Sequence, residues 1–207
     1  PQFTPQIIAQ LIQDEKVTIT AGVPTIWMAL LNELEKGNYN TSSLRGVLCG
    51  GSAAPKVIIE AFEKKYNIPF LHAYGMTETT PLVTISTVKS YQDSDLTEGE
   101  RFDLRAKQGL LVPGLEMKVV GASGEVEWND TDMGELLLRG PWIANEYYKD
   151  ERTDEAFRDG WLHTGDVVTI DEEGNMKIVD RIKDLIKSGG EWISSVDLEN
   201  AIMSHEG

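Results

Sequence analysis

The stretch Leu44-Arg45-Gly46-Val47-Leu48-Cys49-Gly50-Gly51-Ser52-Ala53-Ala54-Pro55 joins an apolar run to a glycine turn and a proline. The run over 44–48 predicts a buried strand, which Gly50 and Gly51 bring to an end. Pro55 suits the first turn of a helix, and apolar residues recur on one face of the sequence after it. The stretch therefore predicts a strand–turn–helix unit.

The same alternation continues on both sides of this unit. A helix is expected over 4–12, where Thr4 has the side chain of a helix cap. The β-branched run 17–23 predicts a strand, Pro24 opens another helix, and 68–71 predicts a further buried strand. Short apolar runs that alternate with amphipathic helices predict a mainly parallel sheet covered by helices.

The pattern changes after residue 90. Residues 91–105 are polar and acidic, and we expect them to form a surface loop. From Leu110 the helical period disappears, apart from one helix near 150–157. Short strands between turns are expected over 116–120, 125–128, 135–139, 166–170 and 176–180.

The fold class expected is therefore α/β plus β. Residues 1–108 form part of a mainly parallel α/β subdomain, and 109–182 form a β-rich subdomain. Residues 183–207 are expected to hold a hinge and the start of a small C-terminal domain, with a helix that begins near 194.

The composition, 41% hydrophobic and 26% charged over 207 residues, is that of an ordinary globular protein. A net charge of −15 argues against binding to nucleic acid or to anionic membranes. No apolar run approaches the roughly 18 residues of a transmembrane span. An anionic nucleotide would need local cations, oriented amides or a metal ion. These bounds favour a cytoplasmic enzyme or binding protein.

The cysteine and the histidines offer little chemistry by themselves. Cys49 lies at the end of a predicted buried strand, so a core position is favoured over a reactive thiol. His72, His163 and His205 are far apart and lack metal-ligand spacing. His163 is expected to be structural.

Two loops directly after predicted strands are candidate ligand contacts. Residues 51–55 would let a flat ligand approach the backbone, although an ordinary loop has the same composition. In the second loop, Tyr74 offers an aromatic face, Thr77 a hydroxyl for a phosphate and Glu78 a carboxylate for Mg²⁺. The alternative is a polar loop in which Tyr74 serves as a packing anchor.

Two later segments carry candidate residues as well. In 160–166, Asp166 follows a glycine and could accept hydrogen bonds from two ribose hydroxyls, or could merely cap a turn. In 180–194, charges alternate with apolar residues before two glycines, which suits a joint between packed units or a solvated strand edge. Arg181 adds a planar donor there, and Lys187 adds a flexible cation.

In this order and spacing, the segments strongly resemble the adenylate-forming acyl-CoA synthetase superfamily. The matching stretches are 74–78, 160–166 and 180–190. The chain is most similar to medium- and long-chain fatty-acid-CoA ligases through 187–200, with support from 138–144. The resemblance covers essentially the whole chain.

The resemblance implies a nucleotide site. Gly51, Ser52, Ala53, Ala54 and Pro55 would flank the adenine together with Tyr74. Gly75 would contact the nucleotide, and Asp166 and Arg181 would hold the ribose hydroxyls.

It also implies catalytic residues and a metal site. Thr77 would touch the nucleotide phosphate, and Glu78 would hold Mg²⁺. Lys187 would line the site of thioester formation, with Gly189 and Gly190 along the CoA channel.

The remaining implied positions concern the acyl group and domain movement. Val23, Gly75 and Met76 would line the acyl pocket, and Lys183 would be the hinge between a large and a small domain. The family's phosphate loop and its C-terminal lysine are absent, so we expect a catalytically inactive middle-to-late piece of a synthetase.

The implied partners of the intact protein are ATP, CoA and a fatty acid, with a homodimer as one expectation for its assembly. A carboxylate and ATP would give acyl-AMP and pyrophosphate, and CoA would then displace AMP. Three alternatives stay open: adenylation of another acid with a carrier-protein acceptor, a non-enzymatic nucleotide-binding module, or an interaction fragment.

Overall fold

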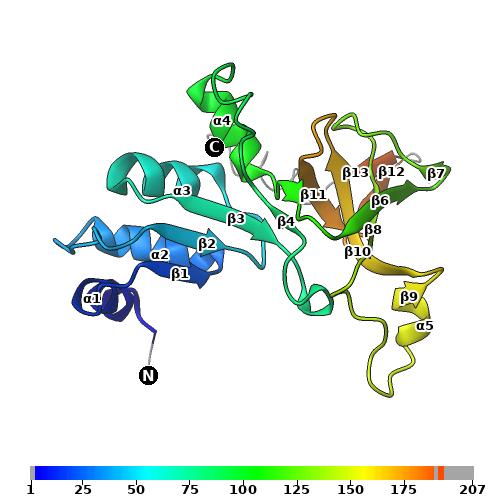
Figure 1. The fold of residues 1–207 in the computed structure, drawn as a ribbon, viewed down its shortest axis with the longest axis horizontal. Coiled ribbons are helices and arrows are strands. Elements are labelled where there is room, and N and C mark those ends of the chain that lie inside the picture. Colours follow the sequence, from blue (N-terminus) through cyan, green and yellow to red (C-terminus); the bar gives the residue numbers. More distant parts are fainter. Residues whose placement is uncertain (1–2, 189–190, 194–207) are drawn as a thin grey trace. The chain divides into compact units, whose positions relative to one another are not determined.

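The computed structural model describes residues 3–188 and 191–193 (Figure 1). The chain forms two compact units. The first comprises Pro1–Met76 and Thr84–Gly109, and the second comprises Thr77–Val83 and Leu110–Gly207. The helix predicted to begin near residue 194 lies outside the described residues.

The first unit is an α/β structure. Its strands β1, β2 and β3 pair in parallel, and β4 pairs antiparallel with β3, which confirms the mainly parallel sheet. The elements are α1 (Pro5–Asp14), β1 (Ile19–Gly22), α2 (Pro24–Leu34), β2 (Gly46–Cys49), α3 (Lys56–Glu60), the π-helix η1 (Ala61–Lys65), β3 (Phe70–Tyr74), β4 (Thr84–Ile85) and α4 (Glu98–Ala106).

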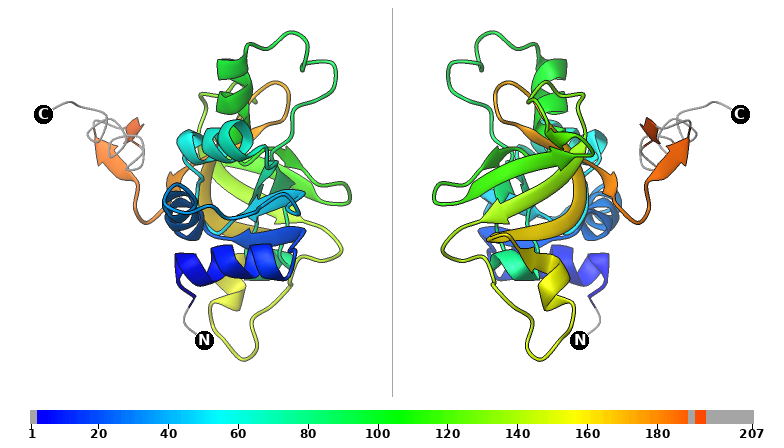
Figure 2. Two further views of the ribbon diagram at one scale, coloured as in Figure 1. Left: turned by 90° about the vertical axis from the view of Figure 1, so that its left-hand side faces the viewer. Right: turned by 90° about the vertical axis from the view of Figure 1, so that its right-hand side faces the viewer.

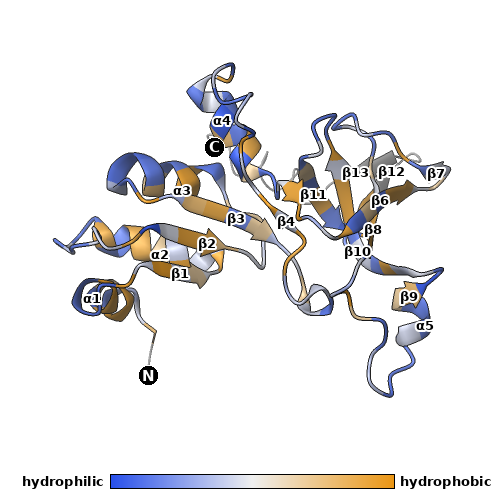
Figure 3. Cartoon of the chain, in the orientation of Figure 1, coloured by the Kyte–Doolittle hydropathy of each residue, from blue (hydrophilic) through white to orange (hydrophobic). Residues whose placement is uncertain are grey.

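Three aromatic side chains pack against one another in the core of this unit. The Trp27 and Phe62 ring centroids lie 6.3 Å apart edge to face, and Phe62 and Phe70 lie 5.6 Å apart. Trp27 Nε1 donates to the carbonyl of Leu48 at 3.1 Å, which joins α2 to β2. Cys49 is buried, and burial raises its pKa to about 12. The prediction that Cys49 is a core residue is therefore confirmed. Figure 3 shows apolar residues concentrated in the strands and on one side of the helices.

The prediction of a surface loop over 91–105 is wrong in its second half, where α4 forms. Thr97 Oγ1 accepts from the Glu100 backbone N–H, and Glu100 accepts from the Thr97 backbone N–H, so both ends of a capping box are present. Phe102 is buried, and Lys56 pairs with Asp103 at 2.5 Å to fasten α4 to α3. The helical period is inconspicuous because most of α4 is polar, although the capping-box spacing is visible in the sequence.

We expect Thr97→Ala to lower the free energy of unfolding of the 207-residue chain by about 1 kcal/mol, since one end of the capping box is lost. Ser90→Ala in the same exposed segment is the control and should change it by less than about 0.5 kcal/mol. Urea unfolding measures both. Equal effects of the two substitutions would show that the capping box does not stabilise α4.

The second unit is built on an antiparallel sheet in the order β11-β10-β8-β6-β7, with β9 on β10. Figure 2 shows β10 from two sides, with β9 and α5 (yellow) at one end of it. Its elements are η2 (Thr77–Thr79), β5 (Leu110–Leu111), β6 (Glu116–Gly121), β7 (Gly124–Glu125), β8 (Gly134–Arg139), α5 (Thr153–Ala156), β9 (Phe157–Arg158), β10 (Trp161–Ile170), β11 (Met176–Arg181), β12 (Ile186–Ser188) and β13 (Glu191–Ile193). The predicted β-rich part is confirmed.

Two elements predicted here are shorter than expected. The helix near 150–157 is reduced to α5, because Asp150 Oδ1 accepts from the Arg152 backbone N–H and holds a turn instead. The strand predicted over 125–128 is shortened to β7, which ends at Glu125. After it, Asn129 Oδ1 accepts from the Thr131 and Asp132 backbone N–H groups and holds a turn. Local side-chain hydrogen bonds thus replace regular structure in both places. No helix among the described residues is long and apolar enough to cross a membrane.

Candidate nucleotide site

A bulge in β10 shapes the site. β10 pairs with β8 at His163↔Leu137 and again at Val167↔Glu135. Four steps along β10 therefore match two steps along β8, and residues 164–166 carry the excess. Bulges bend a strand and redirect the side chains that follow.

Side chains and neighbouring segments satisfy the backbone of this bulge. Thr164 Oγ1 donates to the carbonyl of Leu136 at 2.8 Å and accepts from the Asp166 N–H at 3.1 Å. The Gly165 carbonyl accepts from the Ile182 N–H at 2.9 Å. Gly165 has φ +71°, a conformation that glycine adopts without steric cost. The sequence Thr-Gly-Asp therefore fits the bulge residue by residue.

The bulge brings Asp166 and Arg181 together. They face each other across β10 and β11, and Arg181 Nε lies 2.6 Å from Asp166 Oδ1. The Asp166 side chain is 4% exposed, whereas that of Arg181 is 52% exposed. A buried carboxylate is tolerable because the guanidinium pairs with it. The two residues predicted to hold a ribose thus form one unit.

His163 is held by residues that the sequence analysis did not identify. Its Nδ1 lies 3.1 Å from Glu135 Oε2, and its Nε2 accepts from Arg158 Nε at 3.2 Å. These hydrogen bonds satisfy the ring, and the structural role of His163 stays a prediction. Glu135 lies 28 residues from His163 in the chain, and Arg158 lies 5 residues from it. No local sequence motif predicted either contact.

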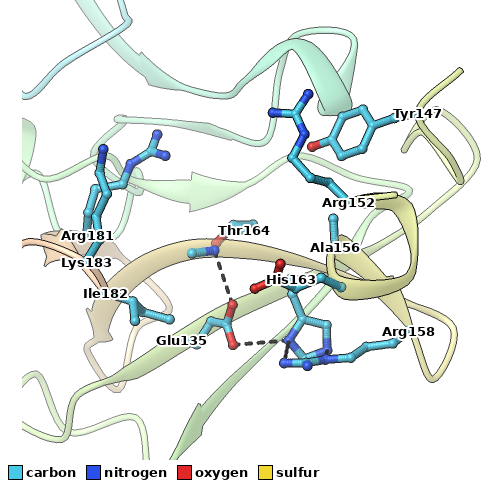
Figure 4. Close-up of a pocket in the computed structure, with 12 residues that line it drawn as sticks. Glu135, Tyr147, Arg152, Ala156, Arg158, His163, Thr164, Arg181, Ile182 and Lys183 are labelled. Carbon is cyan, nitrogen blue, oxygen red and sulfur yellow. Dashed lines mark hydrogen bonds and ion pairs between the residues drawn. The ribbon is translucent and has the colours of Figure 1, made fainter. Parts of the chain in front are cut away.

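A pocket of about 480 Å³ opens over this region (Figure 4). Arg181 and Lys183 lie at one side of it, and Tyr147 and Arg152 lie at the other. Its lining holds four basic residues, if histidine is left aside, and two acidic ones. The lining residues are Glu135, Tyr147, Arg152, Glu155, Ala156, Arg158, His163, Thr164, Gly165, Arg181, Ile182 and Lys183. An acidic protein thus gathers the local cations that a nucleotide requires.

Glu78 is joined to this pocket through Tyr147. Tyr147 Oη donates to Glu78 Oε1 at 2.6 Å, and the Ala144 N–H donates to the Glu78 carbonyl at 2.8 Å. The bond to Glu78 and burial raise the pKa of Tyr147 to about 12. Thr77 is exposed at the start of η2. Sequence reasoning missed Tyr147 because 69 residues separate it from Glu78.

The expected magnesium ligand is a single carboxylate, that of Glu78. The described residues contain no group of three or more His, Cys, Asp or Glu side chains able to hold a metal ion. Mg²⁺ is commonly bound by one or two carboxylates together with substrate phosphates. Glu78 therefore fits the role of a single protein ligand to Mg²⁺ carried by a nucleotide.

The Tyr147–Glu78 bond can be tested by titration. It stabilises the neutral phenol, so its stabilising effect is complete below about pH 10 and is lost as the pH rises to about 12. We expect Glu78→Gln to lower the Tyr147 pKa toward about 10, because the neighbouring negative charge is removed. Phenolate absorbance measures this, with Tyr147→Phe in each background identifying the signal. A Tyr147 pKa that Glu78→Gln leaves unchanged contradicts the contact.

The first unit holds the residues predicted to flank the adenine. Gly51 has φ +84°, and a Cβ on it would lie 3.1 Å from Val23 Cγ1, so these two predicted positions are neighbours. The Ala54 N–H donates to His72 Nε2 at 3.3 Å. Ser52, Ala53 and Pro55 are exposed. The loop is thus exposed at these three residues, and the hydrogen bond from Ala54 to His72 fixes it to β3.

His72 is a further residue whose contacts sequence reasoning missed. It is buried in β3, its Nδ1 lies 3.1 Å from the Lys107 carbonyl, and burial lowers its pKa. A neutral imidazole with a proton on Nδ1 satisfies both neighbours. Tyr74, two residues on, is also nearly buried, as a packing anchor would be, while Gly75 and Met76 are partly exposed.

The last predicted positions are only partly described. Lys183 is exposed after β11, and Lys187 lies in β12 opposite Trp192. Gly189 and Gly190 lie outside the described residues. The assignment of Lys183 to a hinge, of Lys187 to the site of thioester formation and of the two glycines to a CoA channel stays a prediction.

Known proteins resemble this chain both in a family model and in individual sequences. Residues 1–148 match the family described as AMP-binding enzyme. The chain is 46% identical over 208 residues to a long-chain-fatty-acid–CoA ligase of Thermus thermophilus, covering 99% of this chain and 38% of that protein. It is 40% identical to a medium-chain-fatty-acid–CoA ligase of Ectopseudomonas oleovorans, covering 96% of this chain and 36% of that one. The resemblance to such ligases is confirmed.

A solved structure supports the fold. O-succinylbenzoate coenzyme A synthetase from Bacillus subtilis, in complex with ATP and magnesium ion, superposes with a TM-score of 0.79 at 29% identity. The match covers 99% of this chain and 40% of that protein. The chain thus spans well under half the length of the proteins it resembles.

Proposed function

Because this chain belongs to the AMP-binding enzyme family, we propose that the full-length protein is an ATP-dependent fatty-acid–CoA ligase. The fatty carboxylate attacks the α-phosphorus of ATP to give acyl-AMP and pyrophosphate. The CoA thiol then attacks the acyl carbon, loses its proton and expels AMP. The similarity to long- and medium-chain fatty-acid ligases supports this substrate class.

The observation that carries the proposal is the buried Asp166–Arg181 pair beside the pocket. A carboxylate accepts from two vicinal hydroxyls, which is the pattern that a ribose presents. Arg181 is half exposed, so its side chain can turn aside and donate to the same sugar. Together these residues would fix the nucleotide in one orientation, and orientation is a large part of catalysis in such a transfer.

Phosphate charge is assigned to a second group of residues. Thr77 would donate its exposed hydroxyl to a phosphate oxygen, and Glu78 would hold Mg²⁺. When bound, Mg²⁺ neutralises charge on the phosphates. Tyr147 keeps the Glu78 carboxylate in place through its 2.6 Å hydrogen bond. Lysine and arginine side chains in the pocket lining would add positive charge nearby.

Binding of the other groups rests on the family resemblance. Gly51-Ser52-Ala53-Ala54-Pro55 and Tyr74 would flank the adenine. Val23, Gly75 and Met76 would line the acyl pocket. A Cβ on Gly51 would lie 3.1 Å from Val23 Cγ1, and this proximity supports a wall shared with the adenine loop.

The second half-reaction is assigned to the end of the chain. Lys183 would act as the hinge that exchanges the two half-reactions, with Lys187, Gly189 and Gly190 near the CoA thiol.

A product assay tests the proposal. The full-length protein with ATP, Mg²⁺ and CoA is offered fatty acids of several lengths, an aryl acid and amino acids. We expect acyl-CoA, AMP and pyrophosphate in equal amounts, with fatty acids preferred. Preference for an aryl acid would establish the alternative of adenylation of another acid. Release of ADP and phosphate would contradict adenylate chemistry.

The ribose assignment predicts discrimination against 2′-deoxy-ATP. Losing a hydrogen bond to a charged group costs roughly 1.5–3 kcal/mol, so Asp166→Ala should erase most of the preference for ATP. The control Glu116→Ala removes an exposed partner of Arg139, outside this pocket, and should leave the preference intact. kcat/KM for the two nucleotides decides. Full discrimination by Asp166→Ala would reduce Asp166 to a turn cap.

The metal assignment predicts a large effect at Glu78. We expect Glu78→Gln to slow ATP–pyrophosphate exchange by roughly 10² or more, because a metal ligand and its charge are lost. Glu116→Gln, which removes an exposed partner of Arg139, is the control. Normal exchange with unchanged Mg²⁺ dependence in Glu78→Gln would remove the metal role.

A further inference from the structure

We propose that Glu135 is a positioning residue for the nucleotide site. Its two carboxylate oxygens hold the β10 bulge and His163 in the arrangement that directs Asp166 toward Arg181. The inference rests on the proposed function, because it assigns Glu135 to the ribose contact that this function requires.

Glu135 Oε1 takes the place of the backbone acceptor that β8 does not offer to the bulge. In the bulge, the backbone advances without a matching residue on β8, and an unpaired backbone N–H near the protein interior is costly. The Gly165 N–H donates to Glu135 Oε1 at 3.2 Å instead. Glu135 belongs to β8 and is paired with Val167, just beyond the bulge. The Glu135 side chain therefore supplies the acceptor that the β8 backbone does not provide.

The second oxygen fixes His163. Arg158 Nε donates to His163 Nε2 at 3.2 Å, and His163 Nδ1 lies 3.1 Å from Glu135 Oε2 and 3.2 Å from Arg158 Nη2. We assign the ring proton to Nδ1, which then donates to Glu135 Oε2. The Glu135 and His163 side chains are 18% and 14% exposed. Hydrogen bonds shielded from water to this degree constrain geometry more than those of an open surface pair.

The constraint reaches both ribose residues. Gly165 immediately precedes Asp166, and its carbonyl accepts from Ile182, the residue after Arg181. One continuous set of hydrogen bonds thus runs from Glu135 through Gly165 to the end of β11. A shift of Gly165 would move Asp166 and Arg181 with respect to each other.

The position requires a carboxylate. Both neighbours of Glu135 are donors, namely the Gly165 N–H and the His163 Nδ1–H, and a carboxylate accepts at both oxygens. An amide has one oxygen, so Gln would turn its NH₂ toward one of the donors.

The test compares Glu135→Gln with Glu116→Gln in the full-length protein. Both remove a carboxylate from the same sheet, but Glu116 is 60% exposed and pairs with Arg139. We expect the preference for ATP over 2′-deoxy-ATP, as a ratio of kcat/KM, to fall roughly tenfold in Glu135→Gln and to change less than about twofold in the control. An unchanged ratio in Glu135→Gln overturns the inference.

Hydrogen exchange separates this inference from the proposed function. The Gly165 amide should exchange faster in Glu135→Gln than in the wild type or in Glu116→Gln, whether or not the protein makes acyl-CoA. Equal exchange overturns the role of Glu135, whereas a wild type without ATP-dependent ligation overturns only the proposed function. If Glu135→Gln does not fold, His163→Gln decides. It replaces the ring donor to Glu135 Oε2 and should lower the preference for ATP over 2′-deoxy-ATP relative to the wild type, whereas an unchanged ratio overturns the inference.

Discussion

The buried Asp166 carboxylate is paired with Arg181, and the strand irregularity of the second unit lies directly beside this pair. A carboxylate that is 4% exposed is stabilised by a cationic partner, and Asp166 lies in the two-residue excess of β10 over β8, opposite Arg181 at the end of β11. The bulge in turn needs partners for its own backbone, which Thr164, Glu135 and Ile182 supply. Charge pairing and strand irregularity therefore depend on each other.

The pocket beside this pair is locally basic although the chain carries a net charge of −15. Four lysine and arginine side chains line the pocket, compared with two carboxylates. Several of these cations are already paired, Arg181 with Asp166 and Arg152 with Asp150, so each is held in a defined place. A positioned cation stabilises developing charge better than a mobile one, because little reorganisation is needed at the moment of reaction.

Sequence reasoning succeeded where the signal is local. The parallel strands and the Thr4 cap follow from short-range patterns and are found in place. It failed for α4, where Phe102 is the one fully buried apolar residue and the polar composition hid the helix. Tyr147 and Glu135 were missed because their partners lie 69 and 28 residues away. Such contacts depend on strand register and loop path, which residue spacing in one sequence does not determine.

The central claim is that the Asp166–Arg181 pair holds the ribose of the nucleotide. A crystal structure of the full-length protein with AMP bound tests it most directly. The account predicts both ribose hydroxyls within about 2.5–3.2 Å of the Asp166 carboxylate oxygens, with the bulge unchanged. A ribose bound elsewhere, with Asp166 contacting only Arg181, would contradict it.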